Sequence, residues 1–435
     1  MWGGVCLIRV KNVKAGYEVE PLKTSLGFKG GYLTGLWQTV ALMEGESGEK
    51  GMGLGVQSVL WSDPGVFSSF DEKAGNEIMF NITRYALNLV KDIPFETPVD
   101  LLDSLLPPVY EYGKKLAGRP DLRLTFVLNS LVAVDNAAWM LYCIENGISS
   151  FDGMIPGYVR PVLSCRNSSL ASIPLISYGV TGDEIKRIID SGYFFLKIKI
   201  GSDPMKDGDR MKMLEWDKNR LAEIHDMVKD RETSYTKDGH IPYYFDANGR
   251  YDSKDMLLRF LDHADKIGAL DRIILLEEPF PEEYREDVHD LPVRLAADES
   301  AHSDTDVLEL IDLGYSAIAL KPAAKTMSMS FRIVKAAQEK GIPCFCADLT
   351  VNPVLVDWNK NVAARLMPLP GMETGVLESN GPQNYVNWER MKTYHPDNEA
   401  GWIETRNGIF TIDSGFYDKS GGILKPPPHY GSLLK

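Results

Sequence analysis

The sequence predicts an α/β fold centred on a (β/α)₈ barrel, with a second, α+β domain in front of it. Six short apolar runs between residues 194 and 348 each end in a charged residue, and amphipathic stretches at helical spacing separate them. Short, continuous apolar runs are typical of buried parallel strands. Because the C-terminal strand ends of such a barrel carry its chemistry, six charges in register indicate an enzyme.

The predicted barrel strands follow one another in order. They are FFLKIKIG (194–201), IPYYFDANG (241–249), RIILLEEPF (272–280), VRLAADES (293–300), SAIALKP (316–322) and IPCFCAD (342–348), with METGVLES (372–379) as the last strand. The predicted helices between them include MLEWDKNRLAEIHDMVKDRE (213–232), DVLELIDLG (306–314), SFRIVKAAQEKG (330–341) and NPVLVDWNKNVAARLM (352–367). In the third helix Phe331, Val334 and Ala337 lie at helical spacing, and Gly341 is a helix stop.

The first 150 residues differ from the barrel region, because strands come first and long helices follow, at 74–92 and 124–147. Two glycine-rich segments interrupt the strands: GFKGGYLTG (27–35) and GESGEKGMGLG (45–55). Neither carries the Lys-Ser or Lys-Thr of a phosphate loop, so both are expected to be flexible hairpin or lid loops.

At 435 residues the chain is too long for one compact core, so more than one domain is expected. We predict an N-terminal capping domain (1–150), a barrel with the active site (151–379) and a C-terminal segment (380–435). The last segment is rich in Asn, Gly, Pro and Tyr, and GIFTIDSGFYDKSGGIL (408–424) is predicted to be a hairpin that returns to the N-terminal domain.

The composition excludes several classes of protein. Hydrophobic residues make up 44% of the chain and charged residues 25%, as in an ordinary globular protein. The net charge of −14 and the lack of a Lys/Arg run argue against nucleic-acid binding. No segment reaches 18 uncharged apolar residues, so no membrane span is expected. Five cysteines without a disulfide framework favour a reducing compartment, and we predict a cytoplasmic location.

Three carboxylates end consecutive predicted strands: Asp246, Glu277 and Asp298. Adjacent strands lie about 4.8 Å apart, so these side chains are expected to converge. Three like charges so close require a cation. Ligation by oxygen alone favours Mg²⁺, with Mn²⁺ as a substitute. The sequence therefore predicts a site for one divalent ion.

Other polar residues stand next to these three. Glu278 and Glu299 directly follow two of the predicted ligands, and alternation along a strand places them on the opposite face. We expect both to have structural or auxiliary roles. Asn248, two residues beyond Asp246, is within reach of the site and is an auxiliary candidate.

The predicted catalytic residues are lysines. Lys197 and Lys199 share one face of their strand, because side chains repeat with a period of two. Two ammonium groups so close are expected to depress each other's pKa, which allows a lysine to accept a proton near neutral pH. Lys321 lies four strands further round, on the opposite wall, so a substrate between them would meet a base on each face. Salt bridges to the central carboxylates are the alternative role for these lysines.

Taken together, these motifs resemble the enolase superfamily, and within it the muconate-lactonising subgroup of cycloisomerases and dipeptide epimerases. LKIKIG resembles the subgroup's Lys-x-Lys strand, and IALKP its opposing-lysine strand. FDANG, LLEEPF and AADES resemble its three metal-binding segments, and VDNAAWML (134–141) the helix that leads from cap to barrel. The resemblance implies a modified TIM barrel with an α+β capping domain built from N- and C-terminal segments. It also implies that Mg²⁺ stabilises an enediolate formed by removal of the proton alpha to a carboxylate.

The sequence departs from two branches of that superfamily. Asp348 and Lys321 stand where the mandelate-racemase branch has a His-Asp dyad, and Glu378-Ser379-Asn380 stands where dipeptide epimerases have an Asp-x-Asp. Asp348 and Glu378 end strands that give no ligand to the metal site. We expect both to contact the substrate or its proton-transfer groups, with a salt bridge to a lysine as the alternative.

The predicted function is a Mg²⁺-dependent racemase or epimerase acting on a small-molecule carboxylate, with Lys199 and Lys321 as its acid/base pair and Lys197 tuning Lys199. A cycloisomerase, a β-eliminating lyase or dehydratase, and a catalytically silent carboxylate-binding protein are the alternatives. Capping loops around Gly30, Tyr32 and Trp61 are expected to set the substrate. His302 is expected to be a surface residue or a substrate contact, and the fold is compatible with a homo-oligomer.

Overall fold

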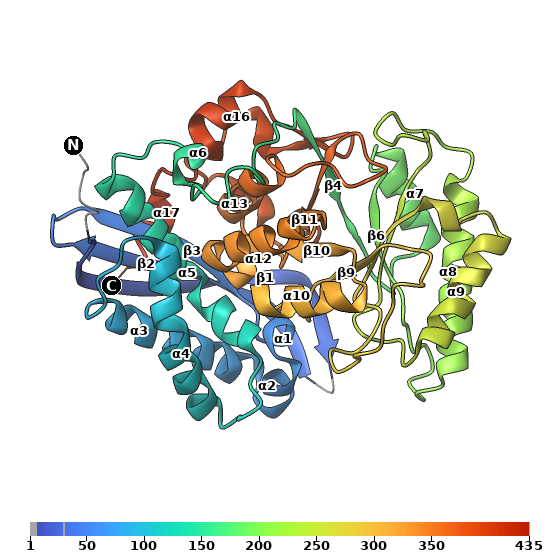
Figure 1. Cartoon of the computed structure of the whole chain (residues 1–435), viewed down its shortest axis with the longest axis horizontal. Helices are drawn as coiled ribbons and strands as arrows, with labels where there is room; N and C mark the ends of the chain where they lie inside the picture. The colour runs from blue at the N-terminus through green and yellow to red at the C-terminus, as the bar shows by residue number, and fades with distance from the viewer. Residues whose placement is uncertain (1–6, 29–30, 435) are drawn as a thin grey trace.

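The computed structural model describes residues 7–28 and 31–434, which form two sheets surrounded by helices (Figure 1). The strands are β1 (Val10–Phe28), β2 (Gly31–Gly45), β3 (Lys50–Gln57), β4 (Ser169–Ile173), β5 (Leu175–Ile176), β6 (Leu196–Lys199), β7 (Tyr243–Asp246), β8 (Ile273–Glu277), β9 (Leu295–Ala297), β10 (Ala317–Leu320), β11 (Cys344–Cys346), β12 (Gly375–Glu378), β13 (Thr405–Arg406) and β14 (Ile409–Thr411).

Helices connect and cover these strands. In the N-terminal part they are α1 (Val59–Ser62), α2 (Pro64–Ser69), α3 (Glu72–Val90), α4 (Pro98–Ala117), α5 (Leu124–Glu145) and α6 (Phe151–Met154). Around the barrel they are α7 (Gly182–Asp190), α8 (Arg210–Val228), α9 (Lys254–Lys266), α10 (Asp304–Leu313), α11 (Pro322–Lys325), α12 (Met327–Glu339) and α13 (Pro353–Ala363). The C-terminal segment adds α14 (Gly381–Asn384), α15 (Trp388–Lys392), α16 (Ser414–Lys419) and α17 (Pro428–Gly431), and short 3₁₀ turns are η1 (Leu270–Arg272), η2 (Gly401–Ile403) and η3 (Ser420–Gly422).

The barrel is a ring of parallel strands. Pro174 divides its first strand into β4 and β5; β4 pairs with β12, and β5 pairs with β6. The carbonyl of Pro174 accepts a hydrogen bond from the backbone N–H of Lys197 (3.0 Å), so pairing continues across the break. Each strand predicted from an apolar run contains one of β6 to β12, in order. The predicted barrel fold is confirmed.

The predicted barrel helices also form, and local signals fix their ends. α10 begins with a capping box in which Ser303 and Asp306 exchange side-chain and backbone hydrogen bonds, and it ends at Gly314 with a φ of 112°. The predicted stop of α12, Gly341, has a φ of 71°. Glycine adopts this left-handed conformation without the steric cost that a Cβ would bring.

The cap is an antiparallel sheet, in the order β1-β2-β3, that packs on α5. The glycine-rich segment 45–55 was predicted to be a loop, but most of it is strand. Only residues 46–49 turn, while Gly51 and Gly53 lie inside β3. A Cβ on Gly53 would lie 2.1 Å from the backbone N of Ala137, and one on Gly51 would lie 2.3 Å from its carbonyl oxygen. These glycines are therefore needed because α5 lies directly against β3.

The C-terminal hairpin is placed differently from the prediction for 408–424. Strands β13 and β14 form a hairpin, but β14 pairs antiparallel with β4 of the barrel, and α16 follows it. The reason is that β6 pairs with β5 and leaves one edge of β4 open, which β14 covers. Other C-terminal residues contact the cap: Tyr385 bridges to Leu22, and His429 contacts Glu18 (2.8 Å).

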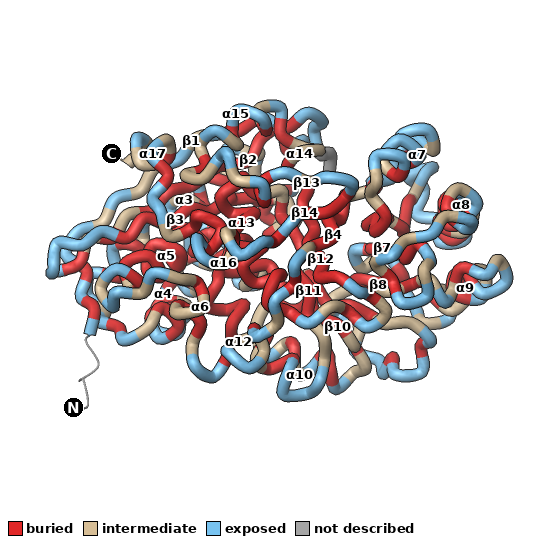
Figure 2. The backbone as a smooth tube through the Cα atoms, turned by 90° about the horizontal axis from the view of Figure 1, so that it is seen from above, coloured by how far each residue is buried: buried red, intermediate tan, exposed pale blue. Residues whose placement is uncertain are grey.

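Cap and barrel share one cluster of buried apolar residues, and Figure 2 shows buried segments in α5 as well as in the barrel strands. Asp135 of α5 links the two parts, because its carboxylate accepts the backbone N–H groups of Met327 (2.9 Å) and Ser328 (3.1 Å) at the start of α12. Among the described residues, α5 is the one helix long and apolar enough to cross a membrane, and 94% of that stretch is buried inside the protein. The cytoplasmic location stays a prediction.

Candidate active site

The register of the barrel strands brings the predicted site residues into one row. Lys199 of β6 pairs with Asp246 of β7, and Asp246 pairs with Glu277 of β8. Glu277 pairs with Ala296 of β9, so Asp298 lies two residues beyond, in the turn after that strand. Parallel pairing thus gathers charged side chains that lie about a hundred residues apart in the chain.

Lys197 lies two residues before Lys199 on β6, and its buried side chain reaches the carboxylates of the neighbouring strands. Its ammonium contacts the carboxylates of Asp246 (2.9 Å), Glu277 (2.9 Å) and Glu378 (3.2 Å). Burial alone would lower the pKa of Lys197, but Asp246 and Glu277 hold it well above its ordinary value. The predicted mutual depression with Lys199 is therefore wrong for Lys197, because three carboxylates outweigh one neighbouring ammonium.

The two predicted acid/base lysines lie at opposite ends of the carboxylate cluster. Lys199 contacts Asp246 (2.6 Å) and donates to the amide oxygen of Asn248. Lys321, which follows β10, contacts Asp298 (2.5 Å). Burial would lower the pKa of Lys321, yet Asp298 and Glu299 raise it above its ordinary value. Both lysines make the salt bridges that were the alternative to catalysis, and a proton-transfer role stays a prediction.

Among the described residues, Glu277, Asp298 and Glu299 form an acidic group whose ligand oxygens all lie within 4.8 Å of one another. Two of the predicted metal ligands belong to it. The third, Asp246, lies beside it, and its carboxylate contacts Lys197 and Lys199 instead.

This acidic group fits a divalent cation. Within the described chain, Asp298 Oδ1 and Glu299 Oε2 are buried without a hydrogen-bond partner. Burial raises the pKa of Glu277 well above its ordinary value, and Asp298 adds to the rise. Buried carboxylates in this state are stabilised by a cation, and a set of oxygens alone suits Mg²⁺ or Mn²⁺.

The placement of Glu299 differs from the expected opposite face. Strand β9 ends at Ala297, and residues 298–300 form a turn, so the two-residue alternation no longer applies. Glu299 therefore faces the same cluster as Asp298, and it also accepts a hydrogen bond from Asn248 (3.0 Å). Asn248 thus connects Lys199 to the acidic group, and its auxiliary role stays a prediction.

Glu278 has the expected structural place. Its carboxylate accepts the backbone N–H of Asp298 (2.8 Å) and the hydroxyl of Ser300 (3.0 Å). Burial raises the pKa of Glu278 to about 8. Glu278 thereby fixes the turn that carries Asp298 and Glu299.

Asp348 and Glu378 differ in what they contact. Asp348 accepts backbone N–H groups from Leu349 (2.7 Å), Val351 (3.2 Å) and Asn380 (2.7 Å), and burial raises its pKa to about 6. It therefore braces the loops after β11 and β12. Glu378 contacts the Lys197 ammonium and accepts from the Asn380 amide (2.8 Å). A salt bridge to a lysine was the alternative prediction, and Glu378 makes it.

Two buried residues that were not predicted also contact the acidic group. Tyr244 donates its hydroxyl to Glu277, and Lys325 donates to the backbone carbonyls of Asp298 and Ala301. Each had a detectable signal. Tyr244 precedes Asp246 by two residues and so shares its strand face, while Lys325 follows Lys321 by four residues, one helical turn.

The cap covers the Lys321 side of the site. The ring centroid of Trp61, in α1, lies 4.5 Å from the Lys321 ammonium, whereas Tyr32 is exposed and Gly30 is outside the described residues. His302 is partly buried, so it is not an open surface residue, and a contact with substrate stays a prediction. It joins cap to barrel, through Thr125 on one ring nitrogen and Glu282 (3.1 Å) on the other.

The barrel region matches a known family. Residues 181–378, from the start of α7 to the end of β12, match the family described as "Enolase C-terminal domain-like". A search of curated protein sequences gives no match.

Solved structures with the same architecture cover nearly the whole chain. A mandelate racemase/muconate lactonizing protein from Herpetosiphon aurantiacus is 16% identical, with a TM-score of 0.64 over 93% of this chain and 96% of that chain. A dipeptide epimerase from Enterococcus faecalis, complexed with Mg and L-Leu-L-Tyr, is 16% identical, with a TM-score of 0.58 over 86% and 90%. The L-Ala-D/L-Glu epimerase from Bacillus subtilis is 15% identical, with a TM-score of 0.59 over 87% and 91%. Identities this low show a shared fold.

Proposed function

Because residues 181–378 match the family described as "Enolase C-terminal domain-like", we propose that this chain is a Mg²⁺-dependent isomerase that removes the proton alpha to the carboxylate of a small molecule. The reaction we favour is racemisation or epimerisation. The observation that carries this proposal is the pair of lysines on two sides of the acidic group, Lys199 at Asp246 and Lys321 at Asp298.

In the proposed mechanism the alpha carbon of the substrate loses one proton and gains another. The neutral form of one lysine takes the alpha proton, and the electron pair of the broken C–H bond moves into the carboxylate to give an enediolate. The protonated lysine on the other wall then donates to the opposite face of the same carbon, which inverts it. Lys197 keeps its proton, since Asp246 and Glu277 raise its pKa, and it offsets charge at the centre of the site.

The metal ligands we propose are Asp246, Glu277 and Asp298, with Glu299 as an additional oxygen donor. Bound Mg²⁺ would stabilise the negative charge that develops on the carboxylate oxygens of the substrate. Asn248 would orient Lys199, with which it shares a hydrogen bond, and the indole of Trp61 would exclude water from Lys321.

A one-base reaction is the second candidate, and it has its own support. Lys321 is enclosed by Trp61, and Asp298 and Glu299 raise its pKa, so it holds its proton more firmly than a base should. In a cycloisomerase or a β-eliminating lyase Lys199 alone would abstract the proton, and Lys321 would only stabilise negative charge.

Hydrogen exchange at the alpha carbon separates the two candidates. Acidic dipeptides, N-acylamino acids and sugar acids, each as separate enantiomers, would be incubated in heavy water with Mg²⁺ and followed by proton NMR. For a two-base racemase, Lys199→Ala and Lys321→Ala each abolish exchange from a different enantiomer and leave exchange from the other nearly intact.

Other outcomes contradict the favoured reaction. Loss of exchange from the same enantiomer in both variants would leave the one-base reaction in its place. If wild-type protein with Mg²⁺ exchanged no alpha hydrogen yet bound a carboxylate, the chain would be a silent carboxylate-binding protein. Lys186→Ala, on the exposed surface of α7, is the matched control and is expected to behave like wild type.

A further inference from the structure

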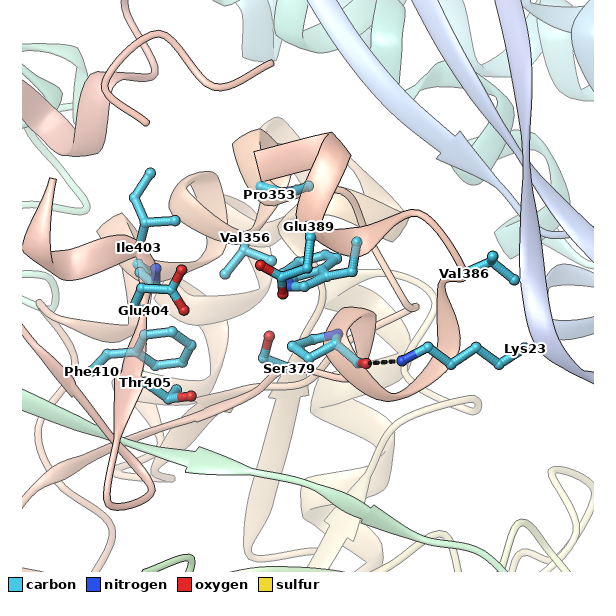
Figure 3. A pocket seen from close by; sticks show the side chains of 13 residues that line it. Lys23, Pro353, Val356, Ser379, Val386, Glu389, Ile403, Glu404, Thr405 and Phe410 are labelled. Carbon is cyan, nitrogen blue, oxygen red and sulfur yellow. Dashed lines mark hydrogen bonds between the residues drawn. The ribbon is translucent and has the colours of Figure 1, made fainter. Parts of the chain in front are cut away.

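A cavity lies outside the barrel, beyond the end of β12. Its volume is about 160 Å³, and its walls come from β1, from α13 and from the C-terminal elements α14, α15 and β13–β14 (Figure 3). An apolar cavity of roughly 150 Å³ accommodates one benzene ring. The cavity is therefore large enough for a single ring with a short substituent.

The cavity has an unpartnered polar group at its inner end. Ser379 directly follows Glu378 but faces away from the barrel, lines this cavity, and is 5% exposed. Its hydroxyl is buried and makes no hydrogen bond to any residue within 7–28 or 31–434. Figure 3 shows that hydroxyl among the apolar side chains of the cavity. A buried hydroxyl left without a partner costs free energy, and a ligand that hydrogen-bonds to it would recover that cost.

The side walls are aromatic and aliphatic. Trp388 of α15 and Phe410 of β14 contribute aromatic rings to the lining, and Val356 of α13 contributes an aliphatic side chain. The Lys360 ammonium lies over one face of the Phe410 ring, 4.1 Å from its centroid, so the ring has one face left. This buried cation is already neutralised, because its ammonium contacts Asp357 (2.7 Å) and donates to the carbonyl of Trp402 (2.8 Å). The walls therefore favour an uncharged, preferably aromatic, body.

The rim of the cavity is suited to an ammonium group. Glu389 and Glu404 both line it, and both contact the ammonium of Lys392, Glu389 at 2.7 Å. The Lys392 ammonium contacts one oxygen of each carboxylate. The other oxygen of each carboxylate accepts no hydrogen bond from a described residue. The rim thus already binds one ammonium group and has acceptors left for a second.

We propose that this cavity is a binding site for a small primary arylalkylamine that carries a hydroxyl on its ring. The ring lies between Trp388 and Phe410, the ring hydroxyl pairs with Ser379, and the ammonium group lies at Glu389 and Glu404. The site is separate from the acidic group of the barrel and does not depend on the reaction catalysed there.

The test is calorimetric titration of the whole chain with three matched probes. Tyramine carries both polar ends, phenethylamine lacks the hydroxyl, and 3-(4-hydroxyphenyl)propanoate has a carboxylate in place of the ammonium group. We expect tyramine to bind about fivefold more tightly than phenethylamine, the size of one hydrogen bond, and the propanoate not to bind.

Variants test whether the amine probes bind in this cavity. Ser379→Ala should make tyramine and phenethylamine equal and leave thermal stability unchanged or higher, because it removes an unsatisfied hydroxyl. Glu404→Gln should weaken both amines about threefold, since the carboxylate is exposed. Val356→Trp fills the cavity and should abolish binding. Ser164→Ala and Glu399→Gln, exposed and outside the cavity, are the matched controls.

Three results would overturn the proposal. One is the absence of binding heat with tyramine at millimolar concentration. Another is equal affinity for all three probes. The third is tyramine binding that survives both Ser379→Ala and Val356→Trp in variants whose melting shows that they are folded.

Discussion

The two sides of the barrel that carry Lys199 and Lys321, here called the Lys199 wall and the Lys321 wall, are enclosed to different degrees. The Lys199 side chain is 17% exposed and contacts polar groups of the neighbouring strand β7 and its loop. The Lys321 side chain is 3% exposed and lies under Trp61 of the cap. The cap therefore shields one wall more than the other, and a proton on Lys321 is less free to exchange with solvent than one on Lys199.

The turns beside the two walls are held by different buried groups, a carboxyl group after β6 and an ammonium group after β9. After β6, Asp217 accepts the backbone N–H of Gly201 (2.8 and 2.9 Å) and the hydroxyl of Tyr251 (2.9 Å). After β9, Lys325 donates to backbone carbonyls, among them that of Ala301 (2.9 Å). The Asp217 carboxyl group accepts hydrogen bonds from backbone N–H and hydroxyl groups, whereas the Lys325 ammonium donates them to carbonyl groups. The stability of the two walls should therefore depend differently on pH and on mutation.

The largest effect is expected at Asp298, which belongs to the acidic group and to the Lys321 wall. Asp298→Asn should remove Mg²⁺ binding measured by calorimetry and lower turnover by about 10³-fold, roughly 4 kcal/mol of transition-state stabilisation. Asp246→Asn tests the Lys199 wall in the same way. Unchanged Mg²⁺ affinity in Asp298→Asn would remove that residue from the proposed ligands, and Asp262→Asn, on the exposed face of α9, is the control.

Replacing Lys325 should destabilise the Lys321 wall. Lys325→Met removes the donor of two buried carbonyls and leaves Asp298 with one cation fewer, at a cost of about 3 kcal/mol. The free energy of unfolding from denaturant titration measures this loss. Lys325→Arg keeps the charge and should lose less. Equal stability of Lys325→Met and wild type would show that the carbonyls find other donors.

On the Lys199 wall the expected effect depends on pH. Burial raises the pKa of Asp217 to about 7, above its unfolded value of 3.8. Between these values the unfolded chain releases a proton that the folded chain keeps, so the contribution of Asp217 to stability is largest at low pH and is lost as the pH rises to 7. Over two pH units this amounts to about 2 kcal/mol.

The amide side chain introduced by Asp217→Asn does not titrate. The variant should therefore lack the decrease in the free energy of unfolding that Asp217 causes as the pH rises. The free energy of unfolding of the variant, relative to wild type, should therefore rise from pH 5 to pH 7.5. Asp255→Asn, on the exposed surface of α9, provides the control. A constant difference across this range would mean that Asp217 is ionised in the folded protein throughout.

Opening the shielded wall should have the smallest effect. Trp61→Ala removes the indole from Lys321 and admits water, and we expect turnover to fall about tenfold. Trp61→Phe keeps a ring face and should retain most of the turnover. If exchange initiated by Lys199 fell as much as exchange initiated by Lys321, Trp61 would act on substrate binding and not on one wall.

Much of the barrel could be predicted because its signals are local. A run such as FFLKIKIG predicts both a strand and the shared face of Lys197 and Lys199. The pairing of this strand with the strand that contains FDANG brings Asp246 into register with Lys199. The role of a residue could not be predicted where it depends on a neighbour that is remote in the chain. The sequence around Gly51 and Gly53 predicts loop glycines, because α5, which lies against them, comes some eighty residues later in the chain.

The sequence by itself determined the period of the strands, the order of the charged strand ends and the all-oxygen character of the acidic group, since each follows from covalent neighbours. The tertiary structure decided that Glu299 turns into the site, that Lys197 is held among three carboxylates, and that Trp61 covers Lys321. The physical reason is that burial and charge are properties of the surroundings. A lysine has one pKa in the chain, and a different one once carboxylates from other strands lie within 3 Å of it.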